Sequence, residues 1–278
     1  MNMKIIELNG IKLHYVEQGK GEPVILVHGS ISDYRTWNFQ IDHFSKRYHV
    51  IAYSRRYHYP NEQPKIGSEF SATIQVEDLH NLIIELGISP AHIIGHSYGA
   101  YISMLYAIKY PDHLRSLVLC DPPLIPWLDS IPGGSSISSF FMKEIRERSG
   151  RAFERGNAEQ GVRIFIDAIS GDGAFDHLST TRQSNLMDNS LSMGAEFLAS
   201  VQDHFPTITC EDVRTICIPT IVLNGEWSLS MFHMITDKLQ ECLPIMKRAT
   251  IPNSSHNMHI TNANFFNEIV MNFLDSIN

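Results

Sequence analysis

The sequence has 278 residues, of which 43% are hydrophobic and 19% are charged, and it contains no low-complexity tract. This length and composition are those of an ordinary globular protein with one large core, and they exclude a mainly disordered chain. The formal net charge of −8 and the isoelectric point of about 5.9 argue against binding to nucleic acid or to an anionic membrane surface, because both require a basic face.

The N-terminal stretch, residues 1–10, lacks the long apolar segment of a signal peptide, and no later stretch approaches membrane-spanning length. We therefore expect a cytoplasmic protein. The four cysteines are Cys120, Cys210, Cys217 and Cys242. They form no C-x-x-C pair and no cluster with histidines at the spacing of metal ligands, so structural zinc is not expected. Cys120 ends an apolar run, where a buried free thiol is commoner than a nucleophile.

The first half of the chain alternates strand and helix patterns. Residues 4–8 and 11–16 predict a hairpin, because Asn9-Gly10 between them tolerates the positive φ values of a tight turn. Four short apolar runs follow, each separated from the next by a segment of helical length: residues 24–27, 50–53, 92–94 and 116–120. Apolar runs without alternation are typical of strands covered on both faces, as in a parallel sheet.

The predicted helices complete this pattern and show where it is interrupted. Residues 73–86 place apolar side chains at helical spacing and stop at Gly87. After Asp121-Pro122-Pro123 the rhythm breaks for residues 124–206, which carry Gly- and Ser-containing sequence with probable helical stretches. It then returns with a strand at 218–223, a helix at 231–243, a strand at 248–251 and a last helix at 264–277. We expect a core domain made of residues 1–123 and 207–278, with residues 124–206 inserted as a helical cap.

The strongest chemical signal is Gly95-His96-Ser97-Tyr98-Gly99, which fits the motif G-x-S-x-G. It lies directly after the predicted strand 92–94 and directly before the predicted helix 100–110. Glycines at both ends allow a strained strand-to-helix turn that exposes Ser97, and the N-terminus of the following helix favours the negative charge that develops there. The sequence therefore predicts Ser97 as a nucleophile rather than as an incidental serine in a tight turn.

A second motif lies earlier, where the apolar strand 24–27 is followed by His28-Gly29-Ser30. Together the two motifs resemble the α/β-hydrolase superfamily, and the likeness covers nearly the whole chain. It implies an α/β fold with a mostly parallel eight-stranded sheet flanked by helices, and a helical cap inserted after strand six. It also implies that the backbone N–H groups of Ser30 and Tyr98 form an oxyanion hole. His28 itself is expected to be a hydrogen-bonded structural histidine rather than a base.

The superfamily places its general base after the last strand, following the chain order serine, acid, histidine. His256 fits this place, because it follows the predicted strand 248–251 and precedes the last predicted helix, with the small residues Ser254-Ser255 leading into it. His259 lies nearby and is the alternative.

The triad acid departs from the common pattern of the superfamily. Members usually carry an aspartate three residues past the glycine that ends the seventh strand, whereas Asn224-Gly225-Glu226-Trp227-Ser228 has serine at that position. Some relatives, including haloalkane dehalogenases, carry the acid at the end of the sixth strand, where this chain has Asp121. We therefore favour Asp121, with Glu226 as the alternative acid and a site without an acid as a third possibility.

Two further segments bear on the pocket. The loop at residues 53–61 contains Arg55 and Arg56 among three tyrosines, which either bind an acidic or aromatic group near the pocket mouth or order the loop through cation–π packing. Met and Phe side chains at helical spacing in residues 124–206 are expected to form the core of the cap. Trp127, close behind Asp121, is the candidate for the pocket rim and for substrate binding.

The resemblance implies serine chemistry through an acyl-enzyme, with no metal and no organic cofactor. Because the nucleophile is serine, the reactions of haloalkane dehalogenases and epoxide hydrolases, which use aspartate there, are not expected. Among the reactions that this triad can perform, we favour hydrolysis of a small to medium carboxylic ester. Carbon–carbon bond hydrolysis of a diketone, lactone opening, perhydrolysis and acyl transfer remain open. A slow or non-catalytic receptor-like binding protein is the alternative from another class.

The expected partner is a small-molecule acyl substrate, without nucleic acid or membrane, and the chain is expected to be a monomer or a homodimer.

Overall fold

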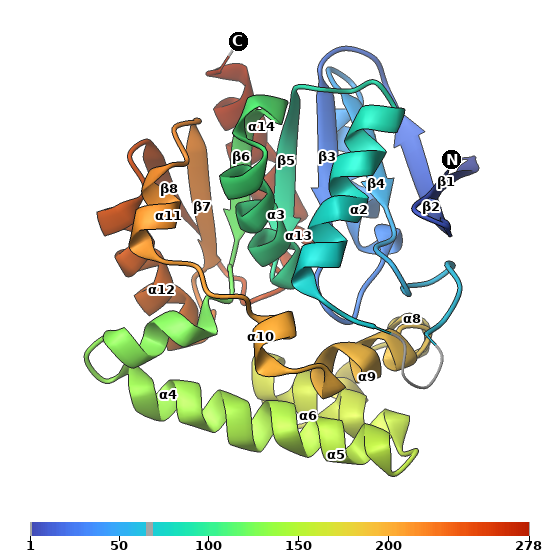
Figure 1. Ribbon diagram of the computed structural model, residues 1–278, viewed down its shortest axis with the longest axis vertical. Helices are drawn as coiled ribbons and strands as arrows, with labels where there is room; N and C mark the ends of the chain where they lie inside the picture. The colour runs from blue at the N-terminus through green and yellow to red at the C-terminus, as the bar shows by residue number, and fades with distance from the viewer. Residues whose placement is uncertain (1, 65–68, 278) are drawn as a thin grey trace.

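The computed structural model describes residues 2–64 and 69–277, so residues 1, 65–68 and 278 of the expected core domain lie outside the described part. Within that part, one sheet has the strands β1 (Met3–Leu8), β2 (Ile11–Gln18), β3 (Pro23–Val27), β4 (His49–Tyr53), β5 (Ala91–His96), β6 (Leu114–Cys120), β7 (Thr220–Gly225) and β8 (Met246–Ile251). Their spatial order is β1-β2-β4-β3-β5-β6-β7-β8 (Figure 1). The pairs β1–β2 and β2–β4 are antiparallel and the others are parallel, as expected.

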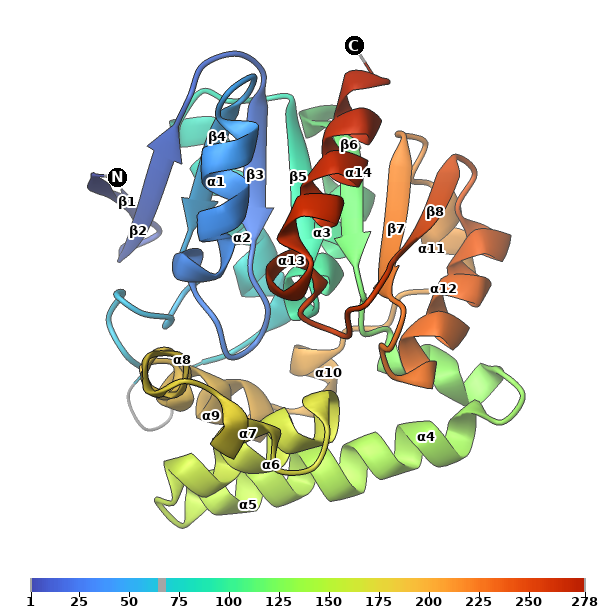
Figure 2. The same ribbon diagram turned by 180° about the vertical axis from the view of Figure 1, so that it is seen from behind.

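Helices cover both faces of this sheet. The helices outside the expected cap are η1 (Tyr34–Trp37), α1 (Asn38–Phe44), α2 (Ala72–Glu85), α3 (Tyr98–Lys109), η2 (Pro111–His113), α11 (Cys210–Arg214), α12 (Ser230–Cys242), α13 (Met258–Thr261) and α14 (Ala263–Asp275). Helices α2 and α3 lie on one face (Figure 1), and α1 and α14 lie side by side on the other (Figure 2). The layers are therefore helix, sheet and helix.

The apolar strand runs are explained by burial on two sides. In β3, Ile25 and Val27 belong to the cluster packed under α2 and α3, whereas Val24 and Leu26 belong to the cluster under α1 and α14. Successive side chains of a strand point to opposite faces, so every position of a doubly covered strand must be apolar. All four side chains are fully buried.

Residues between β6 and β7 form a helical layer at the end of the sheet toward which β3, β5 and β6 point (Figures 1 and 2). We call residues 124–206 the cap. Its helices are η3 (Ile125–Ser130), α4 (Gly134–Phe140), the π-helix η4 (Phe141–Glu147), α5 (Arg148–Glu154), α6 (Ala158–Ser170), α7 (Ala174–His177), α8 (Thr180–Met187), α9 (Ser190–Leu198) and α10 (Val201–His204). Its apolar side chains, such as Val162 and Phe197, continue the core cluster under α2 and α3.

The cysteines include one pair that the sequence analysis did not find. Cys210 in α11 and Cys242 in α12 form a disulfide across 32 residues of sequence, which links two neighbouring helices. Cys120 is a buried free thiol, as expected, and burial raises its pKa well above the usual value. In residues 2–64 and 69–277, no helix is long and apolar enough to cross a membrane.

Candidate active site

Ser97 lies at a sharp turn between β5 and α3. Its backbone has φ 53° and ψ −125°, which is an uncommon conformation for a residue with a side chain. The flanking glycines make the turn possible: a Cβ on Gly99 would lie 2.2 Å from the carbonyl oxygen of Val27, and one on Gly95 would lie 2.6 Å from Cα of Ala100. The turn therefore requires both glycines of the motif, and it brings α3 directly against the end of β3.

The two expected oxyanion donors flank this serine. Tyr98 is the first residue of α3, so its N–H belongs to the end of the helix that attracts negative charge. Ser30 follows the end of β3, and both residues line the same narrow cavity as Ser97. Ser30 and Tyr98 thus lie at separate strand ends beside the nucleophile, where an oxyanion hole is predicted.

His256 lies in the loop between β8 and α13 and is held on three sides. Its Nδ1 lies 3.0 Å from Oδ2 of Asp121, its ring stacks on Phe232 with centroids 4.7 Å apart, and Nε2 of His96 donates to its carbonyl oxygen at 2.7 Å. Burial lowers the pKa of His96 well below its usual value, so that ring is a neutral donor. Because Nδ1 faces a carboxylate, it carries the proton, and Nε2 remains free to accept one.

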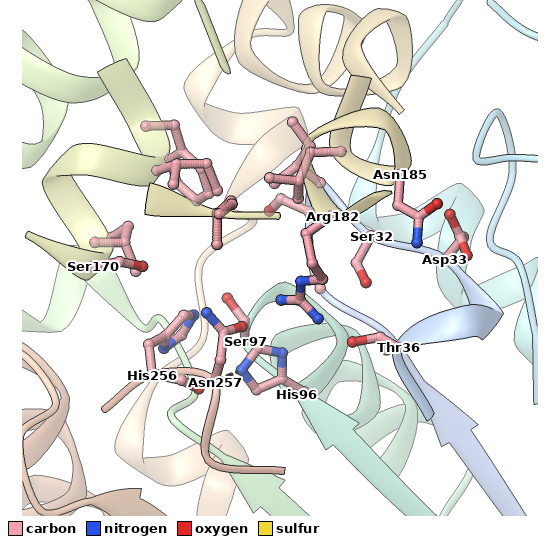
Figure 3. Close-up of a pocket in the computed structure, with 18 of the residues that line it drawn as sticks. Ser32, Asp33, Thr36, His96, Ser97, Ser170, Arg182, Asn185, His256 and Asn257 are labelled. Carbon is pink, nitrogen blue, oxygen red and sulfur yellow. Dashed lines mark hydrogen bonds between the residues drawn. The ribbon is translucent and has the colours of Figure 1, made fainter. Parts of the chain in front are cut away.

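No hydrogen bond joins the Ser97 hydroxyl to His256 in the described part of the chain. Both side chains line the same pocket, and both are buried (Figure 3). Hydrogen bonds between a nucleophile and its base often close only when substrate is bound, so this geometry is compatible with the pairing.

Asp121, which follows β6, is completely buried and has a positive φ of 45°, a region that Asp tolerates better than most residues. Besides His256, it accepts hydrogen bonds from the Ser228 hydroxyl at 2.6 Å and the Asn224 amide at 2.9 Å. Ser228 stands where relatives usually carry the acid. The Ser228 hydroxyl thus occupies the place of the usual acid and donates to Asp121, the carboxylate at the end of β6.

Glu226, the alternative acid, is exposed and is not brought to His256. Its carboxylate accepts the backbone N–H of Asn253 at 2.8 Å and so stabilises the loop after β8. The structure therefore brings Asp121 to His256 and leaves Glu226 at the surface. His259 is also kept apart from Ser97, because its Nε2 pairs with the Thr36 hydroxyl at 2.9 Å.

The loop after β4 has a supporting position rather than a place at the pocket mouth. Arg55 is fully buried and donates to the carbonyl oxygens of His28 and Gly29 at 3.0 and 2.9 Å, directly before Ser30. His28 accepts the backbone N–H of Arg55 at 2.9 Å, which confirms its expected structural role. Arg56 makes two 2.7 Å hydrogen bonds to Asp78. Neither arginine lines the pocket around Ser97, so an acidic group cannot meet them there.

The pocket around Ser97 has two halves. The wide half, with a cavity volume of about 120 Å³, extends under the cap and is partly polar (Figure 3). The narrow half is almost entirely apolar and has a volume of about 20 Å³. Phe165 and Ile169 of α6 border both halves. The reactive serine therefore lies between a roomy polar space and a tight apolar one.

Trp127 was expected at the pocket rim, and this expectation is wrong. Its side chain is buried, and its indole N–H donates to the carbonyl oxygen of Ile208 at 2.6 Å. Trp127 lines neither half of the pocket, and its hydrogen bond joins the start of the cap to the segment that follows the cap. No group of three or more His, Cys, Asp or Glu side chains in the described residues is arranged to hold a metal ion.

Comparisons with known proteins agree with this architecture. The family model described as "alpha/beta hydrolase fold" matches residues 22–153. A putative 2-succinyl-6-hydroxy-2,4-cyclohexadiene-1-carboxylate synthase from Bacillus subtilis is 22% identical over 97% of both chains. Epoxide hydrolase 2 from Caenorhabditis elegans is 30% identical over 44% of this chain, but that match spans only 35% of the relative's length. A meta-cleavage product hydrolase from Pseudomonas fluorescens has a similar structure, with a TM-score of 0.73, 21% identity and coverage of 99% and 98%.

The chain therefore has the α/β-hydrolase fold, and the resemblance to that superfamily is confirmed. Because the similar structure shares only 21% sequence identity with this chain, the similarity identifies the fold but not the substrate. The substrate has to be inferred from the site itself.

Proposed function

We propose that the protein is a serine hydrolase that cleaves a small to medium carboxylic ester through an acyl-enzyme on Ser97. The observation that carries this proposal is the 3.0 Å contact between Asp121 and His256 in the pocket that also exposes Ser97. A neutral imidazole whose Nδ1–H is held by a buried carboxylate is the arrangement that activates a serine hydroxyl.

The reaction follows from these positions. Nε2 of His256 takes the hydroxyl proton as Oγ of Ser97 attacks the ester carbon, and Asp121 stabilises the resulting imidazolium. The N–H groups of Ser30 and Tyr98 receive the negative charge on the carbonyl oxygen. The tetrahedral intermediate collapses by breaking the bond to the leaving alcohol, which takes the proton from His256. Water then repeats the sequence and releases the carboxylic acid.

The pocket supports an ester of limited size. Its narrow apolar half suits a short hydrocarbon group on one side of the reacting carbonyl, and its wide half suits a larger and more polar group on the other. The same nucleophile and base also serve carbon–carbon bond hydrolysis of a diketone, lactone opening and acyl transfer. A substrate panel should therefore include a diketone and a lactone beside the esters.

The test is covalent labelling with a fluorophosphonate probe, measured together with turnover of short-chain aryl esters. Ser97→Ala should abolish labelling and lower turnover by about 10³-fold or more, because the acyl-enzyme cannot form. Ser135→Ala, which changes an exposed serine of the cap, should match the wild type. If the folded wild-type protein neither reacts with the probe nor turns over any substrate of the panel, the proposal is wrong and the receptor-like alternative gains support.

A further inference from the structure

One charged side chain in the pocket has no role in the chemistry described above. Arg182, on cap helix α8, extends into the wide half of the pocket, with its guanidinium group directed toward the sheet end that carries Ser97, His96 and Thr36 (Figure 3). Ser97 and Arg182 thus face one cavity from opposite sides, the first from the sheet and the second from the cap.

Arg182 has no counter-ion in the described part of the chain. The other arginine of this wall, Arg35, forms ion pairs with Asp33 at 2.7 Å and with Asp188 at 2.9 Å. Among residues 2–64 and 69–277, no carboxylate, acceptor oxygen or aromatic ring is paired with the guanidinium of Arg182, and its partial burial lowers its pKa. A cation that has lost part of its hydration without gaining a partner favours an anion at that place.

The surrounding charges strengthen this preference. Among the pocket-lining residues, Asp33 is neutralised by Arg35, which leaves Arg182 as the unpaired charge. The nearby His259 adds no competing positive charge, because burial, with smaller contributions from Arg182 and His256, lowers its pKa to about 3. The charged lining residues Asp33, Arg35 and Arg182 thus sum to one positive charge, because Asp188, the second partner of Arg35, does not line the pocket. Of these three, Arg182 is the one without a partner, which matches one negative charge on a ligand.

We propose that Arg182 binds a carboxylate of the substrate, so that the enzyme selects acyl compounds that carry a free carboxylate group in the wide half of the pocket. This inference rests on the proposed serine hydrolase function. The planar guanidinium presents two parallel N–H donors that fit both oxygens of a carboxylate. A doubly charged phosphate fits less well, because a single cation would leave half of its charge unbalanced.

The test compares matched pairs of esters that differ in one charge. One pair has the carboxylate on the acyl chain, as in an aryl monoester of adipic acid and its methyl-capped form. The other pair has it on the alcohol chain, as in 6-acetoxyhexanoate and its methyl ester. The wild type should prefer the charged member of at least one pair by about 10-fold or more in kcat/KM, because charge-assisted hydrogen bonds are among the strongest polar contacts.

Arg182→Met should lower this preference by roughly 10- to 100-fold, mainly through KM, and Arg182→Lys should retain part of it. Arg151→Met is the matched control, because it also removes one positive charge from the cap, at an exposed position paired with Glu147. It should keep the wild-type preference. An unchanged preference in Arg182→Met, or none in the wild type for either pair, would overturn the inference while ester turnover and probe labelling would still support the proposed function.

A binding measurement separates the two proposals if no substrate is turned over. Calorimetric titration with hexanoate, a carboxylate with a single negative charge, needs no chemistry at Ser97. Binding to the wild type and to Arg151→Met, with at least 10-fold weaker binding to Arg182→Met, would support the carboxylate site even if the hydrolase proposal failed. No difference between wild type and Arg182→Met would overturn it.

Discussion

The end of the sheet and the cap contribute to the same pocket in different ways. In the proposed mechanism, the sheet end supplies the nucleophile, the base, the acid and the oxyanion donors from short segments that follow β3, β5, β6 and β8. The cap supplies much of the surrounding wall, including Phe165, Ile169 and Arg182. On this proposal, the groups that perform the chemistry lie at strand ends, while the groups that would contact the rest of the substrate come from packed helices.

This division leads to a general expectation. A change at the sheet end should lower the turnover of every substrate by a similar factor, because all substrates share the reacting carbonyl. A change in the cap should alter the ratio between substrates instead, because it affects only the part of the molecule that differs among them. Arg182→Met is a change of the second kind, in the cap, and Asp121→Asn is a change of the first kind, at the sheet end.

The largest effect is expected for Asp121→Asn. An amide at this position cannot stabilise the imidazolium of His256 and favours the wrong tautomer, so kcat should fall by about 10³- to 10⁴-fold on all esters. Steady-state kinetics on acetyl, butyryl and carboxylate-bearing esters would measure this loss.

Glu226→Gln is the control for this change, because it makes the same chemical substitution at an exposed carboxylate that contacts Asn253. Its turnover should remain within about 2-fold of the wild type, since surface substitutions rarely have larger effects. A larger loss for Glu226→Gln than for Asp121→Asn would refute the assignment of the triad acid.

The sequence predicted the sheet end well because its signals are local. Every strand and helix predicted outside residues 124–206 is present, with each end within two residues of the predicted one. The pattern G-x-S-x-G is itself a requirement of backbone geometry, as the close contacts of Gly95 and Gly99 show. The prediction of Asp121 as the triad acid followed from residue 228, because a serine stands there where relatives usually carry the acid.

Contacts between distant segments were not predictable in this way. Arg55, after β4, donates to the carbonyl oxygens of His28 and Gly29 after the neighbouring strand β3, and the tyrosines around it in the sequence do not indicate this contact. The orientation of Arg182 depends on how α8 packs against the sheet, and Trp127 turned toward Ile208 rather than toward the pocket. The disulfide joins Cys210 and Cys242, and a separation of 32 residues in the sequence does not by itself predict that two cysteines pair. Helical spacing identifies an amphipathic helix but does not say which neighbour it contacts.

Arg55→Lys tests whether the loop after β4 supports the oxyanion donor at Ser30. Lysine keeps a positive charge near the buried Glu196, whose carboxylate lies 3.9 Å from the guanidinium of Arg55, but it cannot donate to both carbonyl oxygens in the geometry of the guanidinium fork. Loss of a complete oxyanion donor costs about 10²- to 10³-fold in kcat, so a displaced one should cost roughly 10-fold. The loss should appear in kcat and be similar for all esters.

Arg56→Lys is the matched control, because the Arg56 side chain pairs with Asp78 and lines neither half of the pocket. Its kcat should stay close to that of the wild type, and thermal unfolding of both variants would show whether they fold. Equal losses in the two variants, or a loss in Arg55→Lys confined to KM, would argue against a supporting role for Arg55 at the oxyanion donor.

The smallest effect is expected for Ile169→Val, which removes one methyl group from the border of the narrow half. If this half holds the acyl chain, the variant should raise kcat/KM for hexanoyl relative to acetyl aryl esters by roughly 3- to 10-fold. This lies at or below the low end of the roughly 10- to 200-fold that one methylene is worth in an enclosed apolar pocket, because Ile169 only borders this half. Ile166→Val, on the same helix α6, is the control, because Ile166 lines only the wide half. A shift in Ile166→Val but not in Ile169→Val would place the acyl chain in the wide half, and the carboxylate near Arg182 would then belong to the acyl side of the substrate.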